Sequence, residues 1–456
     1  MFTRKDLMKL LAPLIVEQIL IVLVGMVNVV MAAAVGEASV SGVSLVESIN
    51  ILIIQMLSAL ATGGAVISSQ YLGKKQSENA CKAAGQLIGV TTVLSVLVTL
   101  IALAGRGSLL KAIFGSVDES VMNTAVVYFW ITALSYPFVA VYNSCAALFR
   151  SMGNSKASMA VSLVVNTVNV GGNAVCVYGL HMGVTGLAWP TLFCRIAAAV
   201  VMLFMIQSPD NVLRINRLDD LKPNIPMIKK ILSIGIPNGL ENGMFQFGKL
   251  ALQSLVSSLG TAAIASYAVA SNLVTLLYLP GNAIGLGLIT IVGQCVGAGE
   301  KKEAKRYTRL LVGTNYGILL LLCTVMIVFS DQLASVYNLS GEAAKISSRM
   351  VVLHSYAMIV WPLAFTIPYA LRASMDAKFT MVVSIFSMWL FRIAFAYFFV
   401  RVMNTGVMGV WYGMFIDWIF RAVLFGWRFR GIEKRGFCKI DEKSSREQKL
   451  PFYAFI

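Results

Sequence analysis

The chain has 456 residues, of which 58% are hydrophobic and only 13% are charged. Soluble domains have about 25% charged residues, so this chain has too little polar surface to cover a water-soluble globule. The composition therefore excludes the ordinary soluble classes and indicates a protein that folds in lipid.

Apolar stretches long enough to cross a bilayer, about 20 residues each, recur along the whole sequence. They predict an all-α membrane protein with twelve transmembrane helices: residues 10–35, 45–70, 84–104, 121–147, 157–180, 184–206, 231–258, 263–293, 308–329, 345–371, 379–400 and 406–428. The predicted organisation is an N-terminal six-helix bundle (1–206), a cytoplasmic linker (207–230), a C-terminal six-helix bundle (231–432) and a charged cytoplasmic tail (433–456).

The net charge of +16 has two interpretations, nucleic-acid binding and membrane topology. If both termini are cytoplasmic, most of the 37 Lys and Arg residues fall in cytoplasmic segments. The outer segments then hold only Arg106, Lys111, Lys345, Arg349 and Arg401. This bias follows the positive-inside rule, so we expect no nucleic-acid partner. We predict a monomeric, multi-pass protein of the bacterial inner membrane, in contact with lipid and with both termini in the cytoplasm.

An internal repeat of nearly constant offset relates the two halves. The matching pairs are Pro13 and Pro237, Glu17 and Glu241, Gln70 and Gln294, Gly73 and Gly297, Arg150 and Arg372, Lys156 and Lys378, Gly183 and Gly406, and Gly186 and Gly409. Each half holds six predicted spans, an even number, so the halves are parallel repeats. Transporters built from repeats place substrate at the repeat interface and alternate access by moving one half against the other. A duplicated scaffold without transport is the alternative.

Motifs in both halves resemble the multidrug and toxic compound extrusion (MATE) family. They are residues 26–31 (MVNVVM), 148–156 (LFRSMGNSK), 183–191 (GVTGLAWPT) and 293–299 (GQCVGAG). The resemblance covers nearly the whole chain. It implies paired bundles in a V-shaped arrangement and cation-coupled export of amphiphilic, often cationic, compounds.

Ionisable groups within membrane spans are expensive and mark functional sites by default. Glu241 is the strongest candidate, because it falls near the middle of span seven, four residues after Pro237. A carboxylate there can bind H⁺ or Na⁺ and attract an organic cation. The alternative is a carboxylate neutralised by Lys249, two helical turns away on the same face. In one branch of the family the span-seven Glu lies eight residues after the Pro, where this chain has Phe245.

Two further carboxylates are candidates for ion coupling. Glu17 is the repeat partner of Glu241 and lies nearer the cytoplasmic face, where reaching out to the inner interface is the alternative. Asp376 matches the span-ten Asp of the same branch, and capping the following helix is its alternative role.

The resemblance also points to a site in the first half. Prokaryotic members of another branch build a cation site from acids and amides at the positions of Asn28, Asn169, Asn173 and Thr191. Both acids are amides here, so this site, if it survives, can coordinate Na⁺ or hydrogen-bond a drug but cannot exchange a proton. Amides that hold helices together are the alternative.

Other polar and aromatic residues in the spans have structural interpretations. Arg392 and Asp417 fall near the middle of spans eleven and twelve, where we predict an ion pair that Arg421 can share. Arg195 has no partner that the sequence identifies. Tyr136, Tyr278 and Trp361 are candidates for the wall of a substrate cavity.

The sequence thus predicts a secondary antiporter, not an enzyme, that exchanges H⁺ or Na⁺ for an amphiphilic and cationic small molecule. It shows no ATP-binding, nucleophile or metal-cluster motif, so we expect no cofactor and no metal beyond a coupling Na⁺. A lipid-linked saccharide flippase of the same superfamily and a non-transporting membrane receptor or assembly factor remain as alternatives.

Overall fold

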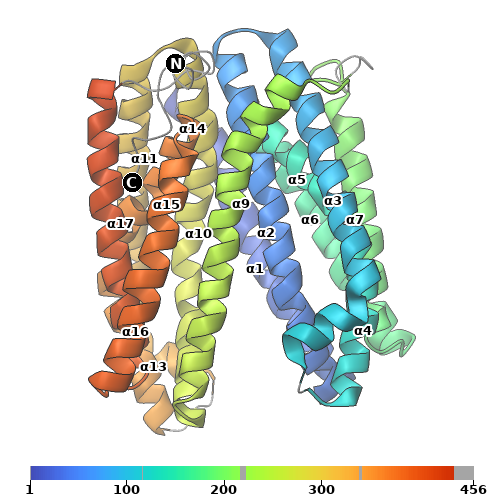
Figure 1. The fold of residues 1–456 in the computed structure, drawn as a ribbon, viewed down its shortest axis with the longest axis vertical. Coiled ribbons are helices and arrows are strands. Elements are labelled where there is room, and N and C mark those ends of the chain that lie inside the picture. Colours follow the sequence, from blue (N-terminus) through green and yellow to red (C-terminus); the bar gives the residue numbers. More distant parts are fainter. Residues whose placement is uncertain (1, 116, 216–221, 338–340, 436–456) are drawn as a thin grey trace. The chain divides into compact units, whose positions relative to one another are not determined.

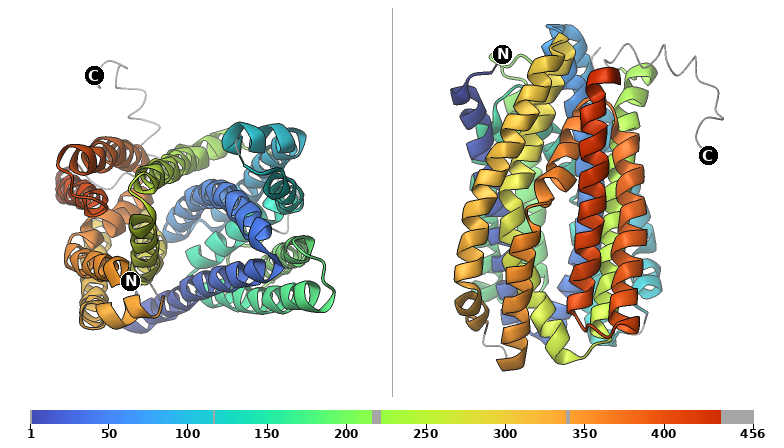
Figure 2. Two further views of the ribbon diagram at one scale, coloured as in Figure 1. Left: turned by 90° about the horizontal axis from the view of Figure 1, so that it is seen from below. Right: turned by 90° about the vertical axis from the view of Figure 1, so that its left-hand side faces the viewer.

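A computed structural model describes residues 2–115, 117–215, 222–337 and 341–435. Within these ranges the secondary structure is helical, and no strand occurs in them. The chain divides into two compact units, Phe2–Gly239 and Leu240–Ile456. In Figures 1 and 2 the long helices of each unit run side by side.

The first unit confirms the first six predicted spans as helices. Its elements are α1 (Arg4–Val35), α2 (Glu37–Gly73), α3 (Ser77–Phe114), α4 (Glu119–Ala133), α5 (Tyr136–Ser151), α6 (Ser155–Ala174), the π-helix η1 (Val175–Gly179) and α7 (Thr185–Ile206). The fourth span is bent by 47° between α4 and α5. Pro137 lies in the first turn of α5, where a missing backbone N–H costs nothing.

The remaining spans are helical as well. Their elements are α9 (Ile225–Ser257), α10 (Thr261–Ala298), α11 (Lys301–Val328), α12 (Ser330–Ser335), α13 (Gly341–Ala357), η2 (Pro362–Thr366), α14 (Ile367–Ala373), α15 (Ala377–Ser387), η3 (Met388–Ala394), α16 (Phe395–Tyr397), η4 (Phe398–Val402) and α17 (Met408–Arg435). The tenth span is bent by 67° between α13 and the η2–α14 segment. The first part of α9 belongs to the first unit and the rest to the second.

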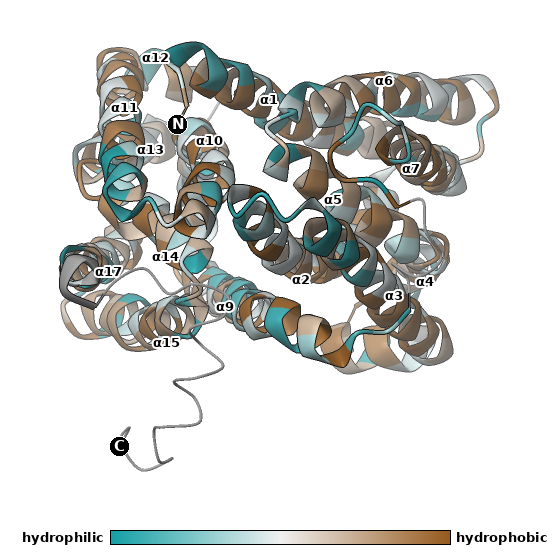
Figure 3. Ribbon diagram, turned by 90° about the horizontal axis from the view of Figure 1, so that it is seen from above, coloured by the Kyte–Doolittle hydropathy of each residue, from teal (hydrophilic) through white to brown (hydrophobic). Residues whose placement is uncertain are grey.

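Nine helices of the described ranges are long and apolar enough to cross a membrane, and the two bent pairs add two more. The helix that completes the predicted twelve is α9, whose polar residues include Asn238, Glu241 and Asn242. Its 33 residues extend over about 50 Å, more than the thickness of a bilayer core. Figure 3 shows hydrophobic residues along most helices, and hydrophilic residues gathered at the near end of α2.

Two boundaries differ from those predicted. The helix α9 begins at Ile225, inside the segment predicted as a linker, and α17 continues to Arg435, past the predicted end of the second bundle. From residue 436 onward, the predicted tail lies outside the described residues.

The backbone repeats the duplication seen in the sequence. The residues with positive φ form five pairs at nearly constant separation: Gly36 and Gly260, Lys75 and Gly299, Gly153 and Met375, His181 and Asn404, and Gly183 and Gly406. The π-helices η1 and η4 are related in the same way. Since a positive φ is uncommon outside glycine, shared turns at Met375 and Asn404 show that the two halves keep the same chain path where their side chains differ.

Each unit has its own apolar core. Phe129 and Leu110 are fully buried in the first, and Trp418 and Met350 in the second. Within the first unit α2 also approaches the start of α9 closely, because a Cβ atom at Gly63 would lie 2.5 Å from a backbone oxygen of α9.

Candidate functional site

The strongest sequence candidate, Glu241, forms a buried ion pair. Nη2 of Arg372 on α14 donates to Glu241 Oε1 at 2.7 Å, and the side chains of Arg372 and Glu241 are 9% and 11% exposed. The alternative in which Lys249 neutralises Glu241 is therefore wrong. Lys249 Nζ instead lies 5.1 Å from the ring centroid of Phe245. Glu241 Oε2 is buried and has no hydrogen-bond partner in the described structure. At this site Arg372 neutralises Glu241, while Glu241 Oε2 remains an acceptor without a donor in the described structure.

Asp376 also pairs with an arginine. Arg428 of α17 donates to both carboxylate oxygens of Asp376, at 2.7 Å and 3.2 Å, and both side chains are about one-quarter exposed. Asp376 stands at the N-cap position of α15, but its side chain makes no capping hydrogen bond. The capping interpretation is therefore wrong, because Arg428 binds both carboxylate oxygens.

Asp417 on α17 lies between two arginines in the second unit. Its Oδ1 accepts from Arg421 Nε at 2.7 Å and from Ser387 Oγ, whereas Nη1 of Arg392 is 3.8 Å from Oδ2. Asp417 thus pairs with both arginines. Its contact with Arg392, the predicted partner, is the longer one, and Arg421, predicted to share the pair, is the close partner. A second donor of Arg421 reaches the backbone oxygen of Ser384 at 3.0 Å.

Phe245 on α9 lies among three cations. Lys249 Nζ, Arg392 Cζ and Arg421 Cζ are 5.1, 5.2 and 5.8 Å from the centroid of its ring. Contacts of this length are typical of cation–π interactions. The ring therefore lies where three helices of the second unit direct positive charge.

The four polar residues predicted in the first unit lie together. Asn173 Nδ2 donates to Asn28 Oδ1 at 3.1 Å and to Asn169 Oδ1 at 3.4 Å, and Asn169 Nδ2 donates to Thr191 Oγ1 at 3.0 Å. Asn169 and Asn173 are buried. Asn173 Oδ1 has no hydrogen-bond partner in the described ranges. The arrangement, which we call the amide cluster, joins α1, α6 and α7 through neutral donors and acceptors.

Glu17 points into the first unit. It is only 5% exposed, and Ser158 Oγ on α6 donates to its Oε2 at 3.1 Å. The interpretation that Glu17 reaches the membrane interface is therefore wrong. No cation of the described residues forms an ion pair with its carboxylate, in contrast to Glu241.

The sequence analysis missed a polar network around Glu47 on α2. Tyr128 Oη and Asn50 Nδ2 donate to Glu47 Oε1 at 2.8 Å and 3.1 Å, and Tyr136 Oη donates to Asn50 Oδ1 at 2.7 Å. Arg195, without a predicted partner, donates to Ser135 Oγ at 2.7 Å. Glu47 was overlooked because it falls close to the predicted start of span two; its spacing of three from Asn50 was the available signal.

The aromatic candidates are packed more tightly than expected for a cavity wall. Tyr136 is fully buried and Trp361 is 4% exposed. Tyr278 stacks on Trp361, with ring centroids 5.7 Å apart, and its Oη lies 2.9 Å from His354 Nε2. Tyr136 and Trp361 therefore belong to the cores of their units.

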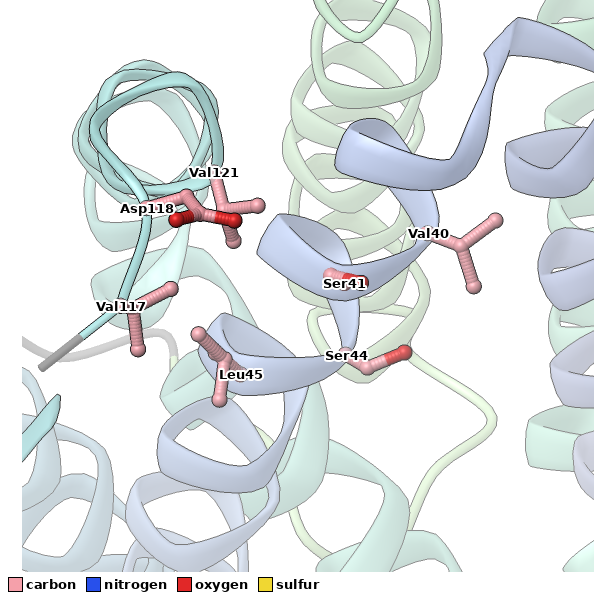
Figure 4. Close-up of a pocket in the computed structure, with 7 residues that line it drawn as sticks. All are labelled: Val40, Ser41, Ser44, Leu45, Val117, Asp118 and Val121. Atoms are coloured by element: carbon pink, nitrogen blue, oxygen red, sulfur yellow. The ribbon is translucent and has the colours of Figure 1, made fainter.

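A pocket of about 560 Å³ opens at one end of the first unit. Figure 4 shows its lining, which consists of Val40, Ser41, Ser44, Leu45, Val117, Asp118 and Val121. None of the predicted site residues lines it. Among the described residues no group of three or more His, Cys, Asp or Glu side chains has the arrangement of a metal site.

Comparison with known proteins gives consistent results. The family model MatE matches residues 13–175 and again residues 237–398, so the two matches begin at the repeat partners Pro13 and Pro237. The uncharacterized transporter YisQ of Bacillus subtilis is 26% identical over 438 residues, covering 93% of this chain and 94% of that protein. The probable multidrug resistance protein NorM of Thermotoga maritima is 24% identical over 434 residues, covering 92% and 91%.

A solved structure shares the fold. It is a MOP superfamily transporter from Pyrococcus furiosus, for which a binding pocket of reverse polarity has been described as suggesting a different function. The TM-score is 0.88, the identity is 19%, and the match covers 94% of this chain and 96% of that one.

Proposed function

The chain belongs to the MatE family of multidrug and toxic compound extrusion proteins, and we propose that it is a secondary antiporter that exports amphiphilic compounds, organic cations among them, in exchange for H⁺ or Na⁺. Family membership makes it a multi-pass membrane transporter of small molecules that needs no cofactor, and not an enzyme. The coupling ion and the substrate charge are the parts that we propose.

The different environments of Glu17 and Glu241 carry the coupling proposal. The two residues are repeat partners, but Glu241 has Arg372 at 2.7 Å, whereas Glu17 is buried against a serine hydroxyl. A buried carboxylate without a counter-charge is expensive, and binding of H⁺ or Na⁺ removes this cost. We therefore assign ion binding first to Glu17. We propose Glu241 as a second ion-binding carboxylate, whose Oε1 is bound to Arg372 in this structure.

The amide cluster is the second proposed site of the first unit. Amide carbonyl and hydroxyl oxygens are ligands for hard cations, and Asn173 Oδ1 is a buried oxygen without a hydrogen-bond partner in the described ranges. Because amides do not exchange protons, this cluster can bind Na⁺ or hydrogen-bond a substrate. Proton coupling must use the carboxylates.

Efflux from proteoliposomes tests the antiporter proposal. Ethidium release is measured under separately imposed H⁺ and Na⁺ gradients for the wild type, Glu17→Gln and Glu241→Gln. We expect one gradient to drive efflux in the wild type and Glu17→Gln to abolish that dependence. The matched control is Glu300→Gln, which changes an exposed carboxylate and should leave efflux unchanged. Gradient-driven efflux at the wild-type rate in Glu17→Gln would remove Glu17 from the mechanism.

We further propose the topology indicated by the basic residues. The two six-helix bundles (1–206 and 231–432) lie in the bacterial inner membrane as a monomer, with both termini in the cytoplasm. Labelling of single-cysteine variants with a membrane-impermeant thiol reagent tests this. A cysteine at Lys75 should react only from the cytoplasmic side and one at Lys111 only from outside. The opposite pattern would invert the topology.

A flippase for lipid-linked saccharides is the second candidate function. The cations around Phe245 favour it, since such lipids carry a pyrophosphate. A fluorescent lipid diphosphate in proteoliposomes decides between the two functions. Its gradient-independent translocation, together with no ethidium efflux, would favour the flippase.

A further inference from the structure

The surroundings of Phe245 in the second unit hold more positive than negative charge. Lys249, Arg392 and Arg421 surround Phe245, and Asp417 is the single carboxylate of the described residues that forms an ion pair with any of them. Three cations against one carboxylate leave an excess of two positive charges. These residues lie within the predicted spans seven, eleven and twelve, where charges are rare unless they are paired or functional.

Of the two arginines, Arg392 is the one without strong partners. Arg421 donates to Asp417 Oδ1 and to the Ser384 carbonyl oxygen. Arg392 is 7% exposed, and its one ionic contact in the described ranges, 3.8 Å to Asp417, is longer than a hydrogen bond. Arg392 Nε is buried without a partner in the same ranges. A guanidinium carries five donors and rarely stays buried with so few acceptors.

Lys249 has an exposed side chain and no ion pair among the described residues. A lysine within a span that faced hydrocarbon would be unfavourable, and such residues face the bundle interior or a water-filled space. We therefore place Lys249 on a surface that water and substrate reach. Its contact with Phe245 gives that surface an aromatic face beside the charge.

Two other acids of this unit, Glu241 and Asp376, are already paired with arginines. Glu241, four residues before Phe245, is bound to Arg372, and Asp376 is bound to Arg428. Neither of them forms an ion pair with Lys249 or Arg392 in the described structure.

The backbone brings the two available cations onto adjoining elements. Arg392 lies in the π-helix η3, and such segments occur often at functional sites. Met388 of the same element packs against Gly248 of α9, where a Cβ atom would lie 2.2 Å from Met388 Cε. Lys249 follows Gly248 directly. The two cations are 5.1 Å and 5.2 Å from the centroid of one ring, so both adjoin Phe245.

We propose that Lys249 and Arg392 bind the carboxylate of an amphiphilic aromatic substrate whose ring packs on Phe245. The site would accept organic anions and the acidic end of zwitterions. This inference names a substrate class for the proposed export function and rests on it, but binding can be measured without transport.

Three probes with one aromatic body and different charges test the inference. Binding of 2-naphthoate, 2-naphthamide and 2-naphthylmethylammonium to the purified full-length protein in detergent is measured by calorimetry. We expect 2-naphthoate to bind most tightly and the ammonium compound most weakly. Lys249→Gln and Arg392→Gln should each weaken 2-naphthoate binding by about tenfold to hundredfold, the effect of losing a hydrogen bond to a charged group. Binding of 2-naphthamide should change little.

Two further variants make the test specific. Lys249→Arg should restore the preference for 2-naphthoate, and Lys111→Gln, at an exposed lysine of α3, should not alter it. Because Lys249 has no ion pair to lose within the described residues, its variants report on binding even if Arg392→Gln does not fold. Equal affinity for the three probes, or unchanged 2-naphthoate binding in Lys249→Gln, would overturn the proposal.

Competition distinguishes the source of the anion. Displacement of 2-naphthoate by inorganic phosphate at micromolar concentration would overturn the carboxylate assignment in favour of a phosphate group. Absence of displacement would support it. Loss of ethidium efflux alone, with 2-naphthoate selectivity intact, would remove the antiporter proposal but keep the anion site.

Discussion

At one pair of equivalent positions of the duplication, the first unit carries a neutral amide and the second unit carries a guanidinium. The sequence offset that relates η1 to η4 also relates Asn169 to Arg392. In the first unit Asn169 donates to Thr191 within the amide cluster. In the second unit Arg392 faces Asp417 and Phe245.

The repeat partners Glu17 and Glu241 differ in whether a cation neutralises the carboxylate. The first unit leaves Glu17 with a serine hydroxyl, whereas the second unit gives Glu241 an arginine. Because the positive-φ turns are shared, the difference arises from side chains on a common backbone path. We accordingly assign ion binding to the first unit and anion binding to the second.

Removal of the Asp417 carboxylate should have the largest effect. Asp417 is fully buried and faces two arginines, so Asp417→Asn leaves both cations without a counter-charge. Breaking a buried ion pair in this way costs about 3–5 kcal/mol. Thermal unfolding in detergent measures the loss. Asp118→Asn, at an exposed carboxylate, is the control, and an equal melting temperature for the two variants would contradict the buried-pair interpretation.

The next largest effect should be that of Glu241→Gln, which should destabilise the protein more than Glu17→Gln at the repeat partner. Glu241→Gln leaves Arg372 buried and unpaired, which should cost about 3 kcal/mol. Glu17→Gln keeps a hydrogen-bonding group against Ser158 and should cost less than about 1 kcal/mol. The double variant Glu241→Met with Arg372→Met should recover most of the loss. Similar destabilisation by both single glutamine variants would contradict the interpretation that only Glu241 depends on a buried counter-ion.

The sequence predicted the fold well, because hydropathy and the repeat are properties of the chain itself. It was weaker for contacts between distant residues. Glu241 and Arg372 are 131 positions apart, and their pairing depends on how α14 packs on α9. Lys249 seemed the partner because helical spacing was the only available criterion. The amide cluster was predicted through the family resemblance, since no periodicity indicates that Asn28 and Asn173 meet.

Introducing an acid into the amide cluster of the first unit should have a smaller effect. Asn173→Asp places a carboxylate beside Asn28 and Asn169 in the amide cluster. We expect the variant, compared in Na⁺ and in K⁺, to melt at a higher temperature in Na⁺. The stabilisation should be about 1.4 kcal/mol when Na⁺ is tenfold above its Kd. If Na⁺ and K⁺ are equivalent for the variant, the cluster holds helices together and does not bind a cation.

The smallest effect should come from Asp376→Asn. This variant tests whether Arg428 contributes to the positive charge around Phe245. Its pair with Arg428 is about one-quarter exposed, and pairs in such surroundings contribute about 0–1 kcal/mol. Asp376→Asn should therefore barely change the melting temperature, and it should leave 2-naphthoate binding unchanged because Asp376 does not contact Lys249 or Arg392. If Asp376→Asn instead tightened 2-naphthoate binding tenfold, Arg428 would belong to the same positive field. The anion site would then extend beyond the surroundings of Phe245.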